Sequence, residues 1–309
     1  MSTVTSIGIG NMGAALASAL VKASTPVTIW NRTADRPQVK SLTTEGATFE
    51  PSLAAALNRS TTILICVLDY TAINSLLHPL LTTNPTPLAG KTILNLTNGT
   101  PADARNMETH LRTLGAAAYF DGAIMVTPQL IGTPTSFAVL SGETEARHRA
   151  LAVGALLAPV GTVQYVAEEV GAAARVDVAA LAGMYGMFAG TFTGIALLQK
   201  GGGGERALPA KPAVDQVVVP MLKALVPYVS LLAEMVDREE WMEDMGNPLA
   251  MQLAGVENIM RACVEDGVDP SGLGFLAGLM RRAVEDGFGE GGVAAVGRYM
   301  LKDSGVRRG

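Results

Sequence analysis

The sequence predicts an α/β N-terminal domain, a long interdomain helix and an all-α C-terminal bundle. Short β-branched segments alternate with helical segments over the first half of the chain, as in a sheet covered by helices. Strand patterning then stops, and a long, largely apolar segment leads into helical stretches. We therefore expect three parts, with bounds 1–167, 168–200 and 201–309.

Composition limits the classes of protein that this chain can belong to. Of its 309 residues 49% are hydrophobic and 17% charged, which favours a large core over disorder. A net charge of -5, without a basic cluster before the last few residues, disfavours nucleic-acid binding. Two distant cysteines, Cys66 and Cys263, and the absence of an apolar leader before the first strand predict a cytoplasmic protein.

The N-terminus carries a glycine pattern between a strand and a helix. From residue 4 the chain reads VTSIGIGNMGAALASALVKASTPVTIWNRT. In a dinucleotide fingerprint the first glycine permits a tight turn, the second admits the pyrophosphate and the third lets the helix approach the strand. The helix N-terminus then favours the anion. The sequence predicts a Rossmann domain, with cofactor contacts at Gly8, Gly10, Asn11, Met12 and Gly13.

The end of the second strand indicates which dinucleotide binds. An NAD-binding domain places an acid there for the ribose 2′-hydroxyl, whereas this chain continues with Asn31, Arg32 and Thr33. A guanidinium suits a 2′-phosphate, and Arg36 offers a second one. Asp35 carries the opposite charge. The alternative interpretation is that all of these side chains are ordinary solvated residues of a loop. We predict NADPH as the cofactor.

Further strands are expected at 61–68, 91–97, 118–125 and 136–142, with helices near 52–58, 71–81 and 101–114. Such alternation predicts a parallel sheet with helices on both faces and a ligand site beyond the strand carboxyl ends. Asn98 lies at a turn, where asparagine is also favoured by turn geometry alone. The residues predicted at these ends are Cys66, Val67, Leu68, Thr97 and Asn98 for the cofactor, and Ile124, Met125, Val126 and Thr127 for a substrate pocket.

The second half is expected to be helical after a last strand at 161–167. The long helix at 168–200 is followed by GGGGE (201–205), which predicts a loop, and by helices near 212–235, 247–266, 270–286 and 291–301. No metal motif is found, and the three histidines all lie in the first half. Residues 178–198 carry no charge and are long enough to span a membrane, but their glycine and alanine content favours a buried helix. So much apolar surface predicts burial against a partner subunit.

The long helix carries one carboxylate, Asp177, and a phenol eight residues later, Tyr185. Eight residues correspond to about 80° of rotation and roughly 12 Å of rise, so both side chains can border one cavity without touching. An unpaired buried carboxylate is costly and usually functional. The alternatives are that Asp177 pairs with Arg175 or a distant cation, and that Tyr185 is ordinary core.

Five segments together resemble imine reductases, most closely the reductive aminase subgroup described chiefly from fungi. They are GIGNMG, WNRT, NLTNGTP, DGAIMVTPQLIG and ARVDVAALAGMYG. The resemblance implies reduction of a C=N bond with hydride from NADPH, condensation of ketones with amines, and homodimers that exchange helical domains. It also implies active-site roles for Asp177, Tyr185 and Asn98, and a pocket that includes Leu222, Met251 and Gln252.

Those residue types suit this chemistry. A carboxylate beside an iminium cation stabilises it, and it can accept a proton from an incoming ammonium. The phenol can hold the substrate nitrogen or donate to the carbonyl oxygen during loss of water. One departure concerns Trp: family members often present one to the substrate, but this chain has only Trp30 and Trp241, which leaves the amine scope open.

Two other functions are weighed against imine reduction. β-Hydroxyacid dehydrogenases share the fold but place a catalytic lysine on the long helix, and no lysine occurs between Lys91 and Lys200. A catalytically silent NADP(H)-binding protein would leave Asp177, Tyr185 and Asn98 free to drift. The natural substrate is not readable from these residues.

Overall fold

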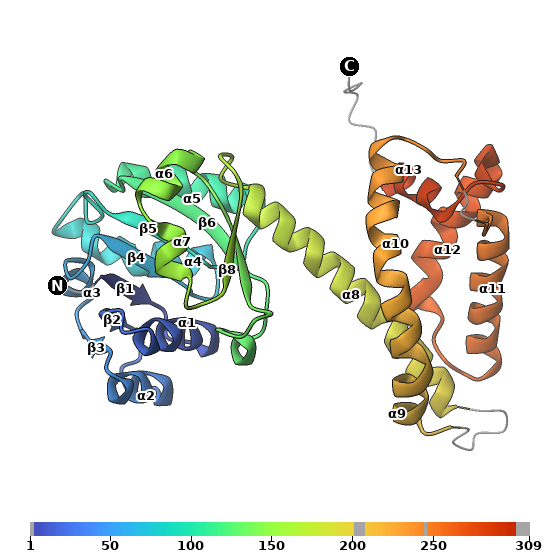
Figure 1. Cartoon of the computed structure of the whole chain (residues 1–309), viewed down its shortest axis with the longest axis horizontal. Helices are drawn as coiled ribbons and strands as arrows, with labels where there is room; N and C mark the ends of the chain where they lie inside the picture. Colours follow the sequence, from blue (N-terminus) through green and yellow to red (C-terminus); the bar gives the residue numbers. More distant parts are fainter. Residues whose placement is uncertain (1–2, 201–207, 244–245, 301–309) are drawn as a thin grey trace. The chain divides into compact units, whose positions relative to one another are not determined.

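The computed structural model describes residues 3–200, 208–243 and 246–300 (Figure 1). The chain divides into two compact units, Met1–Ala182 and Gly183–Gly309, and the division falls inside helix α8 (Ala172–Gln199). The loop expected at 201–205 lies outside the described residues. The first unit is an α/β domain and the second is helical, as the sequence predicts.

A single mixed sheet organises the first unit, in the order β3-β2-β1-β4-β5-β6-β7-β8 (Figure 1). Strands β1 to β6 are parallel and follow the 3-2-1-4-5-6 order of dinucleotide-binding folds, so the order reverses between β1 and β4. The strands are β1 (Val4–Ile7), β2 (Val27–Trp30), β3 (Thr48–Phe49), β4 (Thr62–Ile65), β5 (Thr92–Asn95), β6 (Ala118–Ile124), β7 (Phe137–Ser141) and β8 (Thr162–Ala167). The predicted Rossmann-like sheet is confirmed.

Strand β7 corrects the expectation of a wholly parallel sheet, because it runs antiparallel to β6. A parallel crossover needs a dozen or more residues and usually a helix. The β6–β7 connection instead holds one 3₁₀ turn, Pro128–Leu130, and the chain reverses. Strand β8 is parallel to β7, so both begin at the edge where β1 to β6 end.

Alternate residues of the strands build two cores, one on each face of the sheet. Leu64 joins the core formed with α1 (Asn11–Lys22), α2 (Pro37–Glu45) and α7 (Val153–Leu157). Ile63 and Ile65 join the opposite core, formed with α3 (Leu53–Leu57), α4 (Tyr70–Leu77) and α5 (Pro101–Thr113). The short helix α6 (Glu145–Ala150) completes the unit.

Helices α10 to α13 form the second unit with the end of α8. A small core at Leu249, Leu253, Met280 and Val296 joins α11, α12 and the last turns. Pro227 lies inside α10. The elements are α9 (Ala210–Ala213), a π-helical turn (Val214–Val218), α10 (Val219–Asp237), α11 (Leu249–Glu265), α12 (Ser271–Ala283), a π-helical turn (Val284–Phe288), a 3₁₀ turn (Val293–Val296) and α13 (Gly297–Met300).

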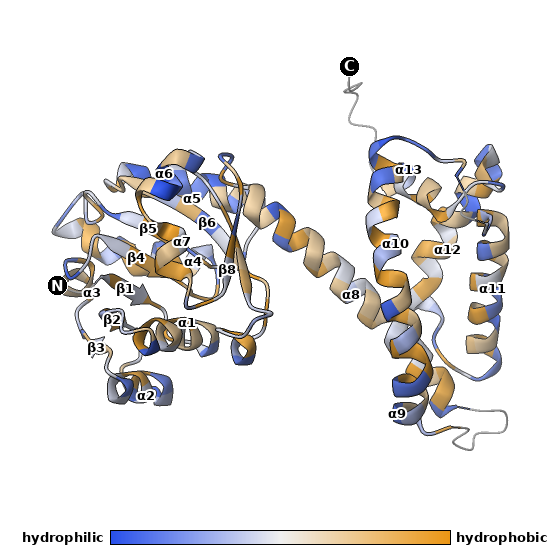
Figure 2. Cartoon of the chain, in the orientation of Figure 1, coloured by the Kyte–Doolittle hydropathy of each residue, from blue (hydrophilic) through white to orange (hydrophobic). Residues whose placement is uncertain are grey.

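Large apolar side chains of α8 and α10 remain exposed within one chain. Figure 2 shows apolar residues along much of both helices. Phe192 is 68% exposed and Val226 64%. By length and composition, Ala172–Gln199 and Ala210–Asp237 could each cross a membrane, which is weak support for a membrane protein. We call the exposed large apolar residues of α10 and of the part of α8 in the second unit the apolar surface: Tyr185, Met187, Phe188, Phe192, Val219, Met221, Leu225, Val226 and Val229.

Candidate active site

The turn after β1 has no room for side chains at two of its three glycines. A Cβ on Gly13 would lie 1.9 Å from the carbonyl oxygen of Gly8, and a Cβ on Gly8 would lie 2.3 Å from that of Cys66. Gly8 also has φ +93°, which favours glycine. At Gly10 the nearest atom to such a Cβ is Arg36 Nη1, at 3.9 Å. The turn is therefore closed toward the protein and open at Gly10.

The open side of this turn coincides with the start of α1. Gly10 is the N-cap residue, and in the described part of the chain no side chain caps the helix. The first turn of α1 carries no acid either. Free amides and the helix dipole together suit an anion. The cradle, which the predicted residues Gly8, Gly10, Asn11, Met12 and Gly13 form, fits the pyrophosphate of a dinucleotide.

The residues expected to recognise the 2′-phosphate lie directly after β2. The side chain of Asn31 accepts from the amide of Ile9 at 2.9 Å and donates to the carbonyl of Thr33 at 2.8 Å, so it ties this loop to the glycine turn. Arg32 and Arg36 are exposed. Asp35, the opposing acid, lies 3.6 Å from Lys40. Arg36 thus offers a guanidinium beside Gly10, and Arg32 offers a second, exposed guanidinium on the same loop.

The ends of β4 and β5 form the next part of this edge. The hydroxyl of Thr97 accepts from the amide of Val67 at 3.2 Å, which joins the two strand ends. Cys66 is buried, and burial raises the pKa of its thiol to about 11, so it is not a nucleophile. Leu68 is 87% exposed, which leaves a large apolar side chain at the predicted cofactor path.

Asn98 and Asp177, far apart in sequence, meet within the first unit. The amide nitrogen of Asn98 donates to Oδ2 of Asp177 at 2.7 Å. Asp177 is only 3% exposed, although most of its neighbours on α8 are exposed. Within the described residues no salt bridge includes Asp177, so the alternative of a pair with Arg175 is not realised. A buried carboxylate without a cation is the arrangement expected of a functional acid.

Sequence reasoning missed a buried polar cluster behind this pair. Asp121, 1% exposed on β6, accepts hydrogen bonds from Tyr70, Tyr119 and Asn95. Burial raises the pKa of the Asp121 carboxyl to about 6, the three hydrogen bonds oppose the rise, and the Asp177 carboxylate adds to it. The signal was present in AYFDGAIM, where a carboxylate interrupts a strand that is otherwise apolar.

The remaining predicted pocket residues belong to both units. Ile124, Met125 and Val126 are half-buried at the end of β6, and Thr127 is exposed. Tyr185 is 63% exposed and contacts Phe188 edge-on, with ring centroids 6.0 Å apart, so it is not core within one chain. In the second unit Leu222 is half-buried, Met251 is 58% exposed, and Gln252 donates to the carbonyl of Asn247 at 2.7 Å.

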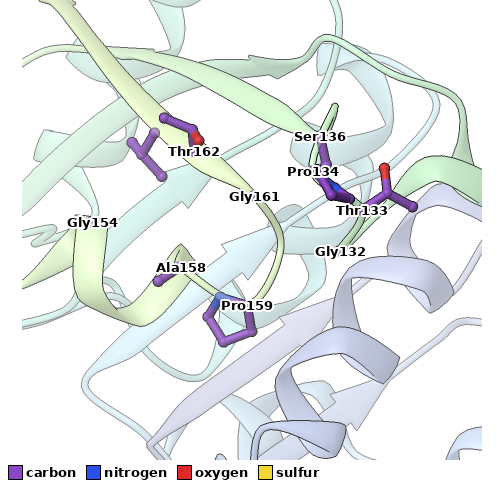
Figure 3. A pocket seen from close by; sticks show the side chains of 10 residues that line it. Gly132, Thr133, Pro134, Ser136, Gly154, Ala158, Pro159, Gly161 and Thr162 are labelled. Carbon is purple, nitrogen blue, oxygen red and sulfur yellow. The ribbon is translucent and has the colours of Figure 1, made fainter.

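A shallow cavity of about 540 Å³ lies elsewhere on the same sheet edge, at the start of β8 (Figure 3). Thr133, Ser136, Pro159 and Thr162 line it, and it includes none of the predicted site residues. Its lining offers hydroxyl and backbone groups but no charge. Among the described residues no cluster of three potential metal ligands occurs.

The glycine cradle, the two arginines and the strand order define the first unit as a Rossmann-type domain for a phosphorylated dinucleotide. Residues 3–124 match the NAD binding domain of 6-phosphogluconate dehydrogenase, and residues 169–302 match the C-terminal domain of NADPH-dependent reductive aminase-like proteins. An NADPH-dependent reductive aminase of Aspergillus oryzae is 33% identical over 84% of each chain.

Solved structures agree with these matches. A reductive aminase from Aspergillus terreus, in complex with NADPH4, cyclohexanone and allyl amine, is 35% identical with a TM-score of 0.86, over 97% of this chain and 99% of that one. An imine reductase from Aspergillus terreus, bound to NADPH4 and dibenz[c,e]azepine, is 36% identical with a TM-score of 0.83, over the same shares. The chain belongs to the NADPH-dependent reductive aminase and imine reductase family. It is an NADP-dependent oxidoreductase that acts on C=N bonds.

Proposed function

We propose that Asn98 and Asp177 form the chemical site for reduction of imines and for coupling of ketones or aldehydes with small primary amines. The observation that carries this proposal is the 2.7 Å hydrogen bond from Asn98 to a buried carboxylate with no cation beside it. The site lies at the strand carboxyl ends, where ligands of such sheets bind. It therefore adjoins the cofactor cradle and offers one uncompensated negative charge.

That charge suits a cationic reacting group. When bound, NADPH supplies the hydride that is added to the imine carbon. The Asp177 carboxylate stabilises the iminium cation in surroundings of low dielectric, where such a contact is strong. In coupling, it first accepts a proton from the incoming ammonium and so frees the amine to attack the carbonyl. It then returns this proton to the hydroxyl that leaves as water, so it is a carboxylate again when the iminium forms. Asn98 orients the carboxylate through its amide and occupies one of its oxygens.

Tyr185 is proposed to hold the substrate nitrogen or to donate to the carbonyl oxygen during loss of water. It lies eight residues after Asp177 on α8, and its exposed hydroxyl is free to reach a ligand. Leu222, Met251 and Gln252 are proposed to line the substrate pocket. Trp is absent from the sequence around Leu222, so we expect an amine scope that differs from that of members with Trp there.

We propose that two copies of the chain share the active sites by exchanging helical domains. The apolar surface of α8 and α10 supports this, because large apolar side chains gathered on exposed helices in such number are typical of an interface. In this arrangement 1–167 binds the cofactor, 168–200 links the parts, and 201–309 covers the partner subunit. Covering the apolar surface in this way is consistent with a soluble, cytoplasmic enzyme.

The proposed site is tested by separating the two reactions. NADPH consumption is measured with a preformed cyclic imine and with cyclohexanone plus a small primary amine, for the parent, Asp177→Ala and Asp177→Asn. We expect both variants to bind NADPH, and coupling to fall more than imine reduction because coupling needs additional proton transfers. Parent-like coupling by purified, NADPH-binding Asp177→Ala would refute the assignment. Turnover of 3-hydroxy acids with NADP, without turnover of either the cyclic imine or the ketone–amine pair, would favour the dehydrogenase alternative.

A further inference from the structure

Three buried polar residues lie side by side on neighbouring strands of the sheet. Asn95 on β5 is in register with Asp121 on β6, which is in register with Ser141 on β7. Their exposed fractions are 0%, 1% and 0%. A buried polar group is costly unless it is hydrogen-bonded, so each of these side chains must be satisfied by a specific partner. Their partners lead to both members of the Asn98–Asp177 pair.

Asp121 gathers three donors on one carboxylate oxygen. Its Oδ1 accepts from the hydroxyl of Tyr70 at 2.6 Å, the hydroxyl of Tyr119 at 2.9 Å and the amide of Asn95 at 3.1 Å. Asn95 also donates to the hydroxyl of Tyr119 at 3.0 Å. Charge-assisted hydrogen bonds are about twice as strong as neutral ones. The carboxylate therefore holds β5, β6 and the start of α4 in one arrangement.

Two of these donors reach the segment that carries Asn98. The side-chain oxygen of Asn95 accepts from the amide of Thr97 at 3.2 Å. The ring of Tyr70 lies against Gly99, where a Cβ would approach its Cε2 atom to 2.3 Å. Thr97 and Gly99 are the two neighbours of Asn98 in the chain. The cluster around Asp121 thus constrains the backbone on both sides of Asn98.

Ser141, the third residue of the row formed by Asn95, Asp121 and Ser141, is hydrogen-bonded to the start of the helix that carries Asp177. The hydroxyl of Ser141 donates to the carbonyl of Val170 at 2.7 Å and accepts from the amide of Ala173 at 2.9 Å. Ala173 is buried against Ala123 and Val139 of the sheet. Asp177 follows Ala173 by about one helical turn on the same face. The row therefore anchors Asn98 and Asp177 to the same three strands.

We propose that Asp121 is a positioning residue of the active site, whose carboxylate, through Tyr70 and Asn95, holds Asn98 where its amide donates to Asp177. This inference rests on the proposed roles of Asn98 and Asp177. Asp121 itself is enclosed by the protein and touches no substrate. Its loss misplaces Asn98 and leaves the carboxylate of Asp177 free to turn from the productive orientation.

Protonation of Asp121 provides a readout that simple packing does not have. The ionisable groups that face Asp121 are Tyr70 from α4, Tyr119 from its own strand and Asp177 from α8; Asp103 of α5 acts on Tyr70. A protonated carboxyl accepts these hydrogen bonds less well, so activity falls as pH drops through the pKa of Asp121. The hydrogen bond from Tyr70 lowers that pKa. Without the Tyr70 hydroxyl, the acid limb of activity moves to higher pH.

The decisive variant is Tyr70→Phe, which removes the hydroxyl and keeps the ring against Gly99. We expect kcat for a preformed cyclic imine to fall ~10-fold, with the dissociation constant of NADPH changed less than twofold. The pH at which kcat falls on the acid side should move up by about one pH unit, because one charge-assisted hydrogen bond to the Asp121 carboxylate is lost. The control is Tyr299→Phe, which removes a hydroxyl that donates to Asp286 at 2.7 Å in the second unit and should leave kcat and its pH profile unchanged.

Two further variants make the outcome decisive. Asp121→Asn should resemble Tyr70→Phe in kcat and should lose the acid limb near pH 6; if it does not fold, Tyr70→Phe decides alone. Parent kcat and an unmoved acid limb in folded Tyr70→Phe would overturn the positioning role. Asp177→Ala separates this result from failure of the proposed site. An inactive Asp177→Ala with a parent-like Tyr70→Phe refutes only the role of Asp121, whereas an active Asp177→Ala refutes the site itself.

Discussion

At the scale of single residues, the chain buries two carboxylates and surrounds them with different numbers of hydrogen-bond donors. Asp177 and Asp121 are both buried carboxylates, and neither forms a salt bridge within the described residues. Asp121 is satisfied by three internal donors, whereas among the described residues the carboxylate of Asp177 accepts from Asn98 alone. Asp121 is thus structurally satisfied, and Asp177 keeps acceptor capacity for a ligand.

The choice of cofactor is a prediction at this scale. Arg32→Ala should weaken NADPH binding ~10- to 100-fold and NADH binding little, because only NADPH loses a charge-assisted contact with a phosphate. Fluorescence titration with both cofactors measures this. Arg149→Ala, which removes an exposed guanidinium paired with Glu145, is the matched control. Equal weakening of NADPH and NADH by Arg32→Ala would count against Arg32 as the phosphate ligand.

The sequence predicted the two halves of the site unequally. The strand-end position of Asn98 left its role open and the family resemblance supplied that role, whereas Asp177 was found from its isolation in an apolar helix and from the resemblance. Their hydrogen bond joins residues 79 positions apart, which no local pattern encodes. Asp121 was missed because it lies in the middle of a buried strand, where an apolar residue is the ordinary expectation.

At the scale of elements, local patterns predicted the strands and most helices, but the direction of β7 depends on a connection. Residues 125–136 are just long enough for a parallel crossover, but their Pro and Gly residues disfavour the helix that such a crossover usually contains. Helices α2, α6 and α7 and the two-residue strand β3 were not predicted, since their sequences are short or largely polar. The apolar content of α8 predicted burial against a partner subunit, and within one chain most of this helix stays uncovered.

The glycine turn supplies the prediction at this scale. Gly13→Ala should lower the free energy of unfolding by ~1–3 kcal/mol or more, because its Cβ would meet the Gly8 carbonyl at 1.9 Å. Gly10→Ala meets no protein atom closer than 3.9 Å, so it should keep parental stability and lose NADPH affinity through its approach to the pyrophosphate. Thermal unfolding and NADPH titration separate the two. Equal stability of Gly13→Ala and the parent would contradict the close packing of this turn.

At the scale of the whole molecule, the proposed shared-site dimer would make the apolar surface a link between stability and function. An active site completed by a partner subunit requires association, and association requires that α8 and α10 be covered. The same surface would then serve folding, solubility and catalysis. This account predicts that the oligomer and the activity are lost together.

Charge placed on the apolar surface tests this link. Phe192→Glu and Val226→Glu should produce monomers by light scattering and lose imine reduction, because a carboxylate in an apolar interface is costly unless paired. Leu151→Glu, at a 39% exposed position of the first unit, should remain a dimer with parental activity. A parent enzyme that is monomeric and active at assay concentration would overturn the shared-site arrangement.

The central claim is that Asp177 acts in the chemistry, and single-turnover hydride transfer tests it most directly. The enzyme is saturated with NADPH, mixed with a preformed cyclic imine, and the loss of nicotinamide absorbance is followed by stopped flow. For Asp177→Ala, with fold and NADPH affinity intact, we predict a rate ~10²- to 10³-fold below the parent, because a stabilising charge at the reacting nitrogen is lost. A rate within about twofold of the parent would show that Asp177 is structural and that the proposed mechanism is wrong.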